Sequence, residues 1–214
     1  MYLYFSQERA SIAPAFSGMW QVNALATRYV LKPFQTKDSI LVGSTIDTAA
    51  GGGSIGLDRQ YVTPGLTQGQ VINGNISGQL MVRELATTDN VDRVVMCIKL
   101  VSNNGQTIRG TLLPSGNYGP TLEFINNATC RNKTIITNSA LTSLTAIEGD
   151  RIVVEIGYQN STAGTTPQAA AKWGAAAPLL PIDETQTTDG AGWLQIAPNL
   201  TFRNTEFIAL GDYD

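Results

Sequence analysis

Histidine is absent from the 214 residues, and its absence excludes several classes of active site. A Ser-His-Asp or Cys-His catalytic arrangement needs an imidazole, and so does a histidine-ligated zinc site. A switch driven by imidazole titration near neutral pH is excluded for the same reason. Any catalysis would therefore have to come from carboxylates, amines, hydroxyls or thiols.

Charged residues are also scarce. They make up 14% of the chain, against about 25% in ordinary globular proteins, and the net charge is -3. Neutral polar residues take their place, with 24 Thr, 14 Asn, 12 Ser and 12 Gln. Such a surface favours stable protein–protein contacts. The absence of a basic run argues against a nucleic-acid partner, because duplex binding depends on clustered Lys and Arg.

Long hydrophobic runs are missing as well. The apolar stretch Val94–Leu100 is too short to span a bilayer and is interrupted by Lys99. The first ten residues have no basic region and reach Gln7, Glu8 and Arg9 too early for a secretory signal. We therefore expect a protein made in the cytoplasm of its host cell, with no signal peptide and no membrane partner.

Cysteine occurs twice, at Cys97 and Cys130. Cys97 lies inside an apolar run, where a thiol usually acts as a small buried hydrophobic group. A disulfide is possible by number, but a cytoplasmic origin disfavours it. We expect two free thiols.

The periodicity that is present has a repeat of two, which is typical of strands. Between Val71 and Val82, aliphatic residues or glycine fill the even positions, while Asn, Ser and Gln fill positions 73 to 79 between them. Arg151–Tyr158 also alternates, and Arg93–Val101 is nearly continuous apolar sequence, typical of a strand covered on both faces. A first strand is predicted at Tyr2–Phe5 and a last strand at Leu200–Leu210.

Helical signals are weak, and residues 122–128 and 167–173 favour only short turns. The predicted strands are separated by Gly, Asn and Thr clusters, with turns at Asn103–Gly105 and Glu148–Asp150. These features predict an all-β fold. We expect one domain over residues 1–214, a jelly-roll-like antiparallel β-sandwich with long loops.

Two segments break the strand pattern and are predicted as flexible loops. Residues 48–70 contain Ala49–Gly53 followed by Pro64–Gly65. Residues 161–192 are rich in Ala, Thr and Pro and carry little charge. A structureless run of that length is unusual in a compact domain, so the second segment is either functional or contains a strand around Ala171–Gly174.

Aromatic side chains are the first candidates for binding. Trp193, with the acidic loop from Asp183 to Asp189, is a candidate glycan site, because aromatic rings stack on sugars and carboxylates bind hydroxyls. The alternative is that Trp20 and Trp193 belong to the core. Trp173 lies in an Ala- and Gly-rich segment and is predicted to be an exposed interface anchor. The polar residues of the acidic loop are Asp183, Glu184, Gln186 and Asp189.

Pairs of carboxylates are the candidates for glycoside hydrolysis, which needs two acids about 5 to 9 Å apart. Among them, Glu155 has an apolar sequence environment, but no spacing singles out a pair. The alternative is a solvated strand face or an ion pair with Arg93 or Arg151. We therefore predict no catalytic residue and no cofactor. The acids considered are Glu123, Glu148, Asp150, Glu155, Asp183 and Glu184.

Two clusters of oxygen-bearing side chains, Asp89–Asp92 and Gly211–Asp214, are candidates for calcium. Both lack the central glycine and the twelfth-position Glu of an EF-hand. We predict no metal site, with turn formation as the alternative for the first cluster and a solvated terminus for the second.

The strand Gly149–Tyr158, with the sequence Gly-Asp-Arg-Ile-Val-Val-Glu-Ile-Gly-Tyr, resembles a strand found in structural proteins of tailed bacteriophages. The resemblance extends thinly over most of the chain. Its other matching positions are Tyr2–Phe5, Trp20, Gly110–Leu113, Trp193 and Leu194.

This resemblance implies a virion component rather than an enzyme, decorating or cementing the capsid through contacts with capsid or tail proteins. By analogy with decoration proteins and fibres, which often sit on threefold axes, we expect a homo-oligomer, specifically a homotrimer. The alternative on the same fold is a carbohydrate-binding module or a receptor-binding tail tip, with surface glycan as its partner.

Overall fold

The computed structural model describes residues 1–21, 27–43, 46–47, 53–86, 89–120, 124, 129–160 and 167–203. Every regular element within these ranges is a strand. The strands are β1 (Tyr2–Arg9), β2 (Arg28–Lys32), β3 (Leu41–Val42), β4 (Ile46–Asp47), β5 (Ile55–Val62), β6 (Val71–Ile72), β7 (Asn75–Glu84), β8 (Val91–Val101), β9 (Ile108–Asn117), β10 (Arg131–Ala140), β11 (Leu144–Thr145), β12 (Arg151–Asn160), β13 (Gln168–Trp173) and β14 (Trp193–Ile196).

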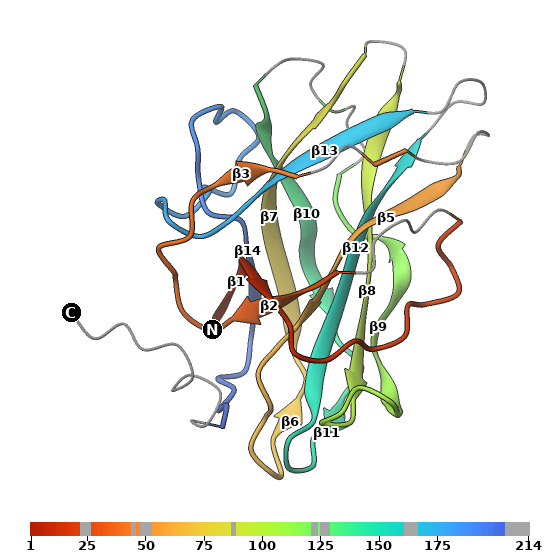
Figure 1. The fold of residues 1–214 in the computed structure, drawn as a ribbon, viewed down its shortest axis with the longest axis vertical. Coiled ribbons are helices and arrows are strands. Elements are labelled where there is room, and N and C mark those ends of the chain that lie inside the picture. Colours follow the sequence, from red (N-terminus) through yellow and green to blue (C-terminus); the bar gives the residue numbers. More distant parts are fainter. Residues whose placement is uncertain are drawn as a thin grey trace.

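The strands form an all-β sandwich, which confirms the predicted fold class (Figure 1). Ten strands follow one another in the order β3-β13-β7-β14-β1-β2-β5-β12-β8-β9. In addition, β10 pairs with β7 and β4 pairs with β13, while β6 and β11 form a separate small sheet. One pairing departs from the expected antiparallel arrangement, because β2 runs parallel to β5.

The sheet curls until β9, at one end, approaches β10, which branches off β7. A bridge joins Tyr118, just after β9, to Ile136 in β10, and the amide of Thr142 donates to the carbonyl of Leu112 at 2.8 Å. One apolar cluster fills the interior of the sandwich, and strands from both sides contribute to it, among them β7 with Leu80 and β12 with Ile156. The described strands therefore share one main core.

Strands β8 and β12 lie deep in the sandwich, as the apolar sequence of β8 predicts. Both are buried along nearly their whole length. Ile152 and Ile156 of β12 point into the main core, whereas Val153 points to the opposite face and packs against Ala10 and Ile12. The N-terminal segment 10–21 therefore covers the outer face of this part of the sheet, where solvent would otherwise reach it.

Glycine conformations fix two of the turns and divide one predicted strand. Gly105 and Gly149 have φ angles of +74° and +82°, which confirms the turns expected there. Gly74 has a φ angle of +75°, so the strand predicted over residues 71–82 is divided into β6 and β7. A left-handed residue cannot continue an extended ladder.

The predicted loop at 48–70 is wrong for residues 55–62, which form β5 between β2 and β12. The cause is a β-bulge. Ile156 pairs with Arg59 and Gly157 with Leu57, so Asp58 is an extra residue in β5. Because residues 58–60 are all polar, the sequence did not indicate a buried strand here. Residues 48–52 lie outside the described residues.

The second predicted loop, 161–192, contains β13 at Gln168–Trp173, where a short turn was also expected. The strand predicted as the alternative near Ala171–Gly174 is present, but it begins earlier, at Gln168. Three consecutive alanines, 169–171, are fully buried against β7. Residues 174–192 form no strand apart from a bridge between Leu179 and Ala191, and residues 161–166 lie outside the described ranges.

The predicted last strand at 200–210 is described only as far as Arg203. Within that part, Phe202 forms a single bridge with Leu66. The last strand of the described chain is β14.

Candidate functional site

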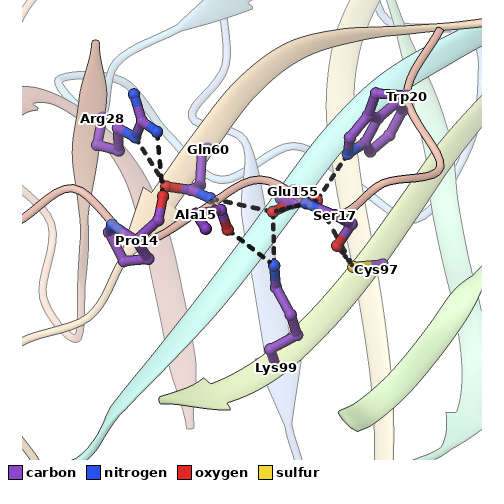
Figure 2. Close-up of polar contacts among 9 residues, drawn as sticks. All are labelled: Pro14, Ala15, Ser17, Trp20, Arg28, Gln60, Cys97, Lys99 and Glu155. Atoms are coloured by element: carbon purple, nitrogen blue, oxygen red, sulfur yellow. Dashed lines mark hydrogen bonds and ion pairs between the residues drawn. The ribbon is translucent and has the colours of Figure 1, made fainter. Parts of the chain in front are cut away.

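Glu155 is the centre of a buried polar cluster on the outer face of the sheet, where the N-terminal segment 10–21 crosses β5, β8 and β12 (Figure 2). Its carboxylate accepts a hydrogen bond from Lys99 Nζ at 2.9 Å and from Trp20 Nε1 at 2.6 Å. The backbone amide of Ser17 donates to both carboxylate oxygens, at 3.0 and 3.2 Å. Gln60 Nε2 adds another donor at 3.0 Å. Donors from three other parts of the chain thus converge on one acid.

The cations of this cluster also hold the backbone of the N-terminal segment. Lys99 Nζ donates to the carbonyl of Ala15 at 3.1 Å, and Arg28 Nη2 donates to the carbonyl of Pro14 at 3.0 Å. Figure 2 shows both side chains reaching across to this segment. Lys99 and Arg28 therefore anchor the segment through its main chain, whereas Trp20 anchors it through its own side chain.

The electrostatics of the cluster keep Glu155 ionised. Burial alone acts to raise the pKa of Glu155, but the hydrogen bonds from Lys99 and Trp20 and the positive charge of Lys99 outweigh it, so the pKa lies below its ordinary value. A general acid in a glycosidase needs the opposite shift. The ion-pair partner is Lys99; Arg93 lies beside Asp92, and Arg151 donates to the carbonyl of Thr63.

Cys97 lies at the edge of the same cluster, with its Sγ 3.1 Å from Ser17 Oγ and 3.7 Å from Glu155 Oε2. Burial and the negative charge of Glu155 raise the pKa of the thiol to about 11. A thiol with so high a pKa is a poor nucleophile near neutral pH. Cys97 and Cys130 are both free and buried, which confirms the expected absence of a disulfide.

A second buried polar cluster lies inside the sandwich, around the bulge in β5. Asp58 is 1% exposed and accepts a hydrogen bond from the hydroxyl of Tyr158. Burial raises the pKa of Asp58 to about 7, although the Tyr158 hydrogen bond and the charge of Arg59 act in the opposite direction. An acid of this kind changes its charge near neutral pH in a protein that has no histidine.

Arg59 lies in the same interior, with its guanidinium 4.1 Å from the centre of the Tyr29 ring and 4.9 Å from that of the Trp173 ring. Its Nη1 donates to Gln7 Oε1 at 3.0 Å and to the hydroxyl of Tyr61 at 3.4 Å. The aromatic faces stabilise the buried cation. Asp58 and Arg59 were missed at the sequence level, because two neighbouring charges rarely both enter a core.

The three tryptophans are all core residues. The prediction that Trp173 is an exposed anchor is wrong: it is fully buried, with its ring 5.5 Å from that of Phe5. The small alanines before it in β13 leave room for the indole. Trp193 is 2% exposed and donates from Nε1 to the carbonyl of Leu180 at 2.8 Å. Together with the buried Trp20, this confirms the core alternative for Trp20 and Trp193.

The acidic loop 183–189 is attached to neighbouring strands by its carboxylates. Asp183 Oδ1 accepts from Asn132 Nδ2 at 2.9 Å, and Glu184 Oε1 accepts from the amide of Thr134 at 3.1 Å. Asp189 pairs with Lys172 of β13. Because the Trp193 ring is buried, the structure does not place it beside these acids as an exposed sugar-stacking surface.

The first calcium candidate forms a turn, as the alternative predicted. Asp89 Oδ2 accepts from the amide of Ala86 at 2.7 Å, and Asn90 has a φ angle of +48°. The second candidate, Gly211–Asp214, lies outside the described residues. Nowhere in the described ranges do three His, Cys, Asp or Glu side chains gather as a metal site would require.

Several exposed apolar side chains lie at the edge formed by β3. Residues 34–42 run beside residues 172–179: Val42 pairs with Lys172, and the carbonyl of Asp38 accepts from the amides of Ala175 and Ala176 at 3.2 and 3.0 Å. We call these two segments the β3 rim; Figure 1 shows β3 beside β13 at the margin of the sheet. Its exposed apolar side chains are Phe34, Leu41, Val42 and Leu179.

The β3 rim also borders an open recess of about 430 Å³. Its lining consists of small or polar residues and contains no aromatic ring; these residues are Gln35, Thr36, Lys37, Ala175, Ala176, Ala177 and Pro178. Sequence reasoning missed the rim because residues 34–42 carry no motif. The signal available was the group of apolar residues around Leu41 and Val42 in a polar chain.

No protein-family model and no curated protein matches this sequence. A solved structure of a CocE/NonD family hydrolase from Staphylococcus aureus is similar at a TM-score of 0.39 and 10% identity, covering 92% of this chain and 36% of that one. The chain thus spans about a third of the hydrolase's length, and so slight a likeness does not bear on function. In the part of the chain described, no helix has the length and apolar character needed to cross a membrane.

Proposed function

We propose that the chain is a non-enzymatic structural protein of a tailed-phage virion, which binds neighbouring capsid or tail proteins through the β3 rim. The resemblance of Gly149–Tyr158 to strands of such proteins gives the class. The observation that carries the proposed mode of binding is the presence of exposed apolar residues on an edge segment, with Leu41 57% and Val42 43% exposed.

Exposed apolar groups at a sheet edge favour association, because each side chain that leaves water on binding contributes to stability. Edge strands of soluble proteins usually carry charges or prolines that prevent pairing with another chain. The β3 strand itself consists of Leu41 and Val42 and has neither. An assembly subunit uses such an edge as an interface.

The carboxylates support a structural role over a hydrolytic one. Glu155 is surrounded by donors from its own chain and stays ionised, and the acids of the loop 183–189 bind backbone amides or Lys172. Each of these carboxylates stabilises a segment of the fold, and this structural role explains why the carboxylate is there without invoking a substrate. A glycan-binding function has less support, because the rings of Trp173 and Trp193 are buried.

The first prediction concerns assembly and uses a matched pair of variants. Leu41→Glu places a charge in the β3 rim and should reduce self-association or binding to particles at least tenfold. Ile108→Glu changes a residue of equal exposure, 57%, outside the rim and should leave both unchanged. Native mass and sedimentation measure self-association, and quantitative mass spectrometry of purified virions gives the copy number.

Each outcome distinguishes between the proposals. Hundreds of copies per virion support capsid decoration, and a dozen or fewer support a position in the tail. Absence from particles contradicts the virion proposal. Equal effects of the two variants contradict the rim as the interface, and glycan binding by the folded Leu41→Glu variant would move the function to the carbohydrate alternative.

A further inference from the structure

We propose that the charge state of Asp58 controls how firmly the β3 rim is held to the sandwich, with Arg59 and Gln7 as the connecting residues. This inference rests on the proposed function, because it concerns the regulation of the same rim.

The bulge in β5 is the origin of the coupling. Leu57 and Gln60 both point to the outer face, where they meet Trp20 and Glu155 respectively. The extra residue places Asp58 and Arg59 together on the inner face, so a buried carboxyl and a buried guanidinium are sequence neighbours. They form no ion pair within 4 Å; each has its own partners.

Gln7 of β1 connects Arg59 to the rim. Its side-chain oxygen accepts from Arg59 Nη1 at 3.0 Å, and its side-chain amide donates to the carbonyl of Trp173 at 2.9 Å. Its backbone amide donates to Asp38 Oδ2 at 2.8 Å. Trp173 and Asp38 belong to the two segments of the rim. One glutamine therefore joins the interior cation to both halves of the interface.

Ionisation of Asp58 would disturb this arrangement through charge. When Asp58 is protonated it is neutral, so Arg59 keeps its hydrogen bond to Gln7 and its contacts with the rings of Tyr29 and Trp173. The carboxylate is a buried negative charge whose closest sequence neighbour is Arg59, so it attracts the guanidinium away from Gln7 Oε1. Loss of that hydrogen bond frees the Gln7 side chain and weakens its contact with Trp173.

The other groups that face Asp58 do not change charge in the same range. Burial raises the pKa of Tyr158 well above its ordinary value and also raises that of Tyr61. Both phenols therefore stay neutral near pH 7. Trp173, from β13, is not titratable. The change near neutral pH is therefore assigned to Asp58.

The test is hydrogen exchange of the monomeric protein at about pH 5.5 and about pH 8.5, expressed as protection factors to remove the intrinsic effect of pH. The probes are amides that hold the rim: Gly43, Gly174, Ala175 and Ala176. The control amides are Ser102 and Gly105 in the turn before β9. We expect rim protection to fall at least tenfold more than control protection at the higher pH.

Two variants identify the route. Asp58→Asn keeps an oxygen acceptor for Tyr158 but has no charge to gain, so its rim should stay protected at both pH values. Gln7→Met removes the side-chain connection between Arg59 and Trp173 and keeps the backbone hydrogen bond to Asp38, so its rim should be less protected than that of the wild type at about pH 5.5 and should no longer respond to pH. A wild-type rim whose protection is independent of pH, or an unchanged pH effect in Asp58→Asn, would overturn the inference.

This experiment is independent of the assembly test. Rim protection is read on monomers, so it can respond to pH whether or not the rim binds a partner. If Leu41→Glu abolishes association while the protection factors of the rim amides are the same at both pH values, the proposed function stands and the Asp58 inference fails. If rim protection follows Asp58 but Leu41→Glu associates normally, the inference about local structure stands and the rim is not the interface.

Discussion

At the scale of single residues, the pair of Glu155 and Lys99 shows how a buried charge is made tolerable. The two side chains are 0% and 6% exposed, and both make further hydrogen bonds to the N-terminal segment. A buried pair is often no more stable than a well-packed apolar replacement. Removing one partner is different, because it leaves the other charge buried and uncompensated.

We therefore predict that Lys99→Ala lowers the free energy of unfolding by about 3 to 5 kcal/mol. The double replacement Lys99→Met with Glu155→Leu should recover much of that loss, since neither charge remains. Lys37→Ala, at an exposed lysine, should change stability by about 0.5 kcal/mol or less. Urea unfolding of the four proteins measures these values, and a Lys99→Ala variant as stable as Lys37→Ala would show that the pair is not desolvated.

At the scale of elements, the N-terminal segment 10–21 behaves as a cover for the sheet although it contains no strand. It packs Ile12 against Val153 and Trp20 against Leu57, so its apolar side chains shield the outer faces of β5 and β12. Its main chain is held by Glu155, Lys99 and Arg28. An irregular segment of this kind depends on side-chain anchors, because no ladder of strand hydrogen bonds holds it.

Trp20→Phe should loosen this cover. The replacement keeps a ring in the apolar site but loses the hydrogen bond to the Glu155 carboxylate, which is worth about 1.5 to 3 kcal/mol for a charged acceptor. We expect that loss in stability and faster chymotrypsin cleavage at Phe16, followed by mass spectrometry.

Trp193→Phe provides the control, since its indole donates to the neutral carbonyl of Leu180. It should cost about 0.5 to 1.5 kcal/mol for the hydrogen bond and leave cleavage at Phe16 unchanged. Equal cleavage rates in the two variants would mean that Glu155 does not anchor the segment.

At the scale of the whole molecule, two buried acids give stability opposite dependences on pH. The pKa of Glu155 is lowered by folding, so the stability it contributes is lost as pH falls through its folded pKa. The pKa of Asp58 is raised from 3.8 to about 7. Between these values the folded state holds a proton that the unfolded state lacks, so stability falls as pH rises across that window.

The free energy of unfolding should therefore be highest in mildly acidic solution and should decline up to about pH 7. Asp58→Asn should remove that decline, because the amide does not titrate. Denaturant unfolding at a series of pH values measures both curves. If wild type and Asp58→Asn decline in parallel between pH 4 and 7, the decline has another origin.

Much of the sandwich could be predicted from local patterns. The alternation in Arg151–Tyr158 and the apolar run in Arg93–Val101 identified two strands at the centre of the fold, and β1 was identified from its first residues. These predictions succeeded because an alternating pattern and an apolar run are both local properties of extended chain that packs against a core, although β12 proved to be buried on both faces. The buried strand β5 failed the same test because its bulge breaks the alternation at Asp58.

The candidate sites depended on contacts that no local pattern contains. Ser17 and Glu155 are 138 residues apart, and Lys99 and Glu155 are 56 apart. Their meeting depends on the register of β12 against β8, where Glu155 lies opposite Cys97. The sequence could name Glu155 as an acid with apolar neighbours, but it could not choose Lys99 over the two arginines.

By itself, the sequence determined the all-β class and the absence of imidazole chemistry. Composition and a repeat of two were sufficient for these, because both are properties of the chain before it folds. Only the tertiary structure decided that Trp173 is core, that Asp58 and Arg59 share an interior, and that Leu41 and Val42 lie on an open edge. Burial and exposure of these residues follow from the order in which distant strands pair, and that order minimises the free energy of the whole molecule.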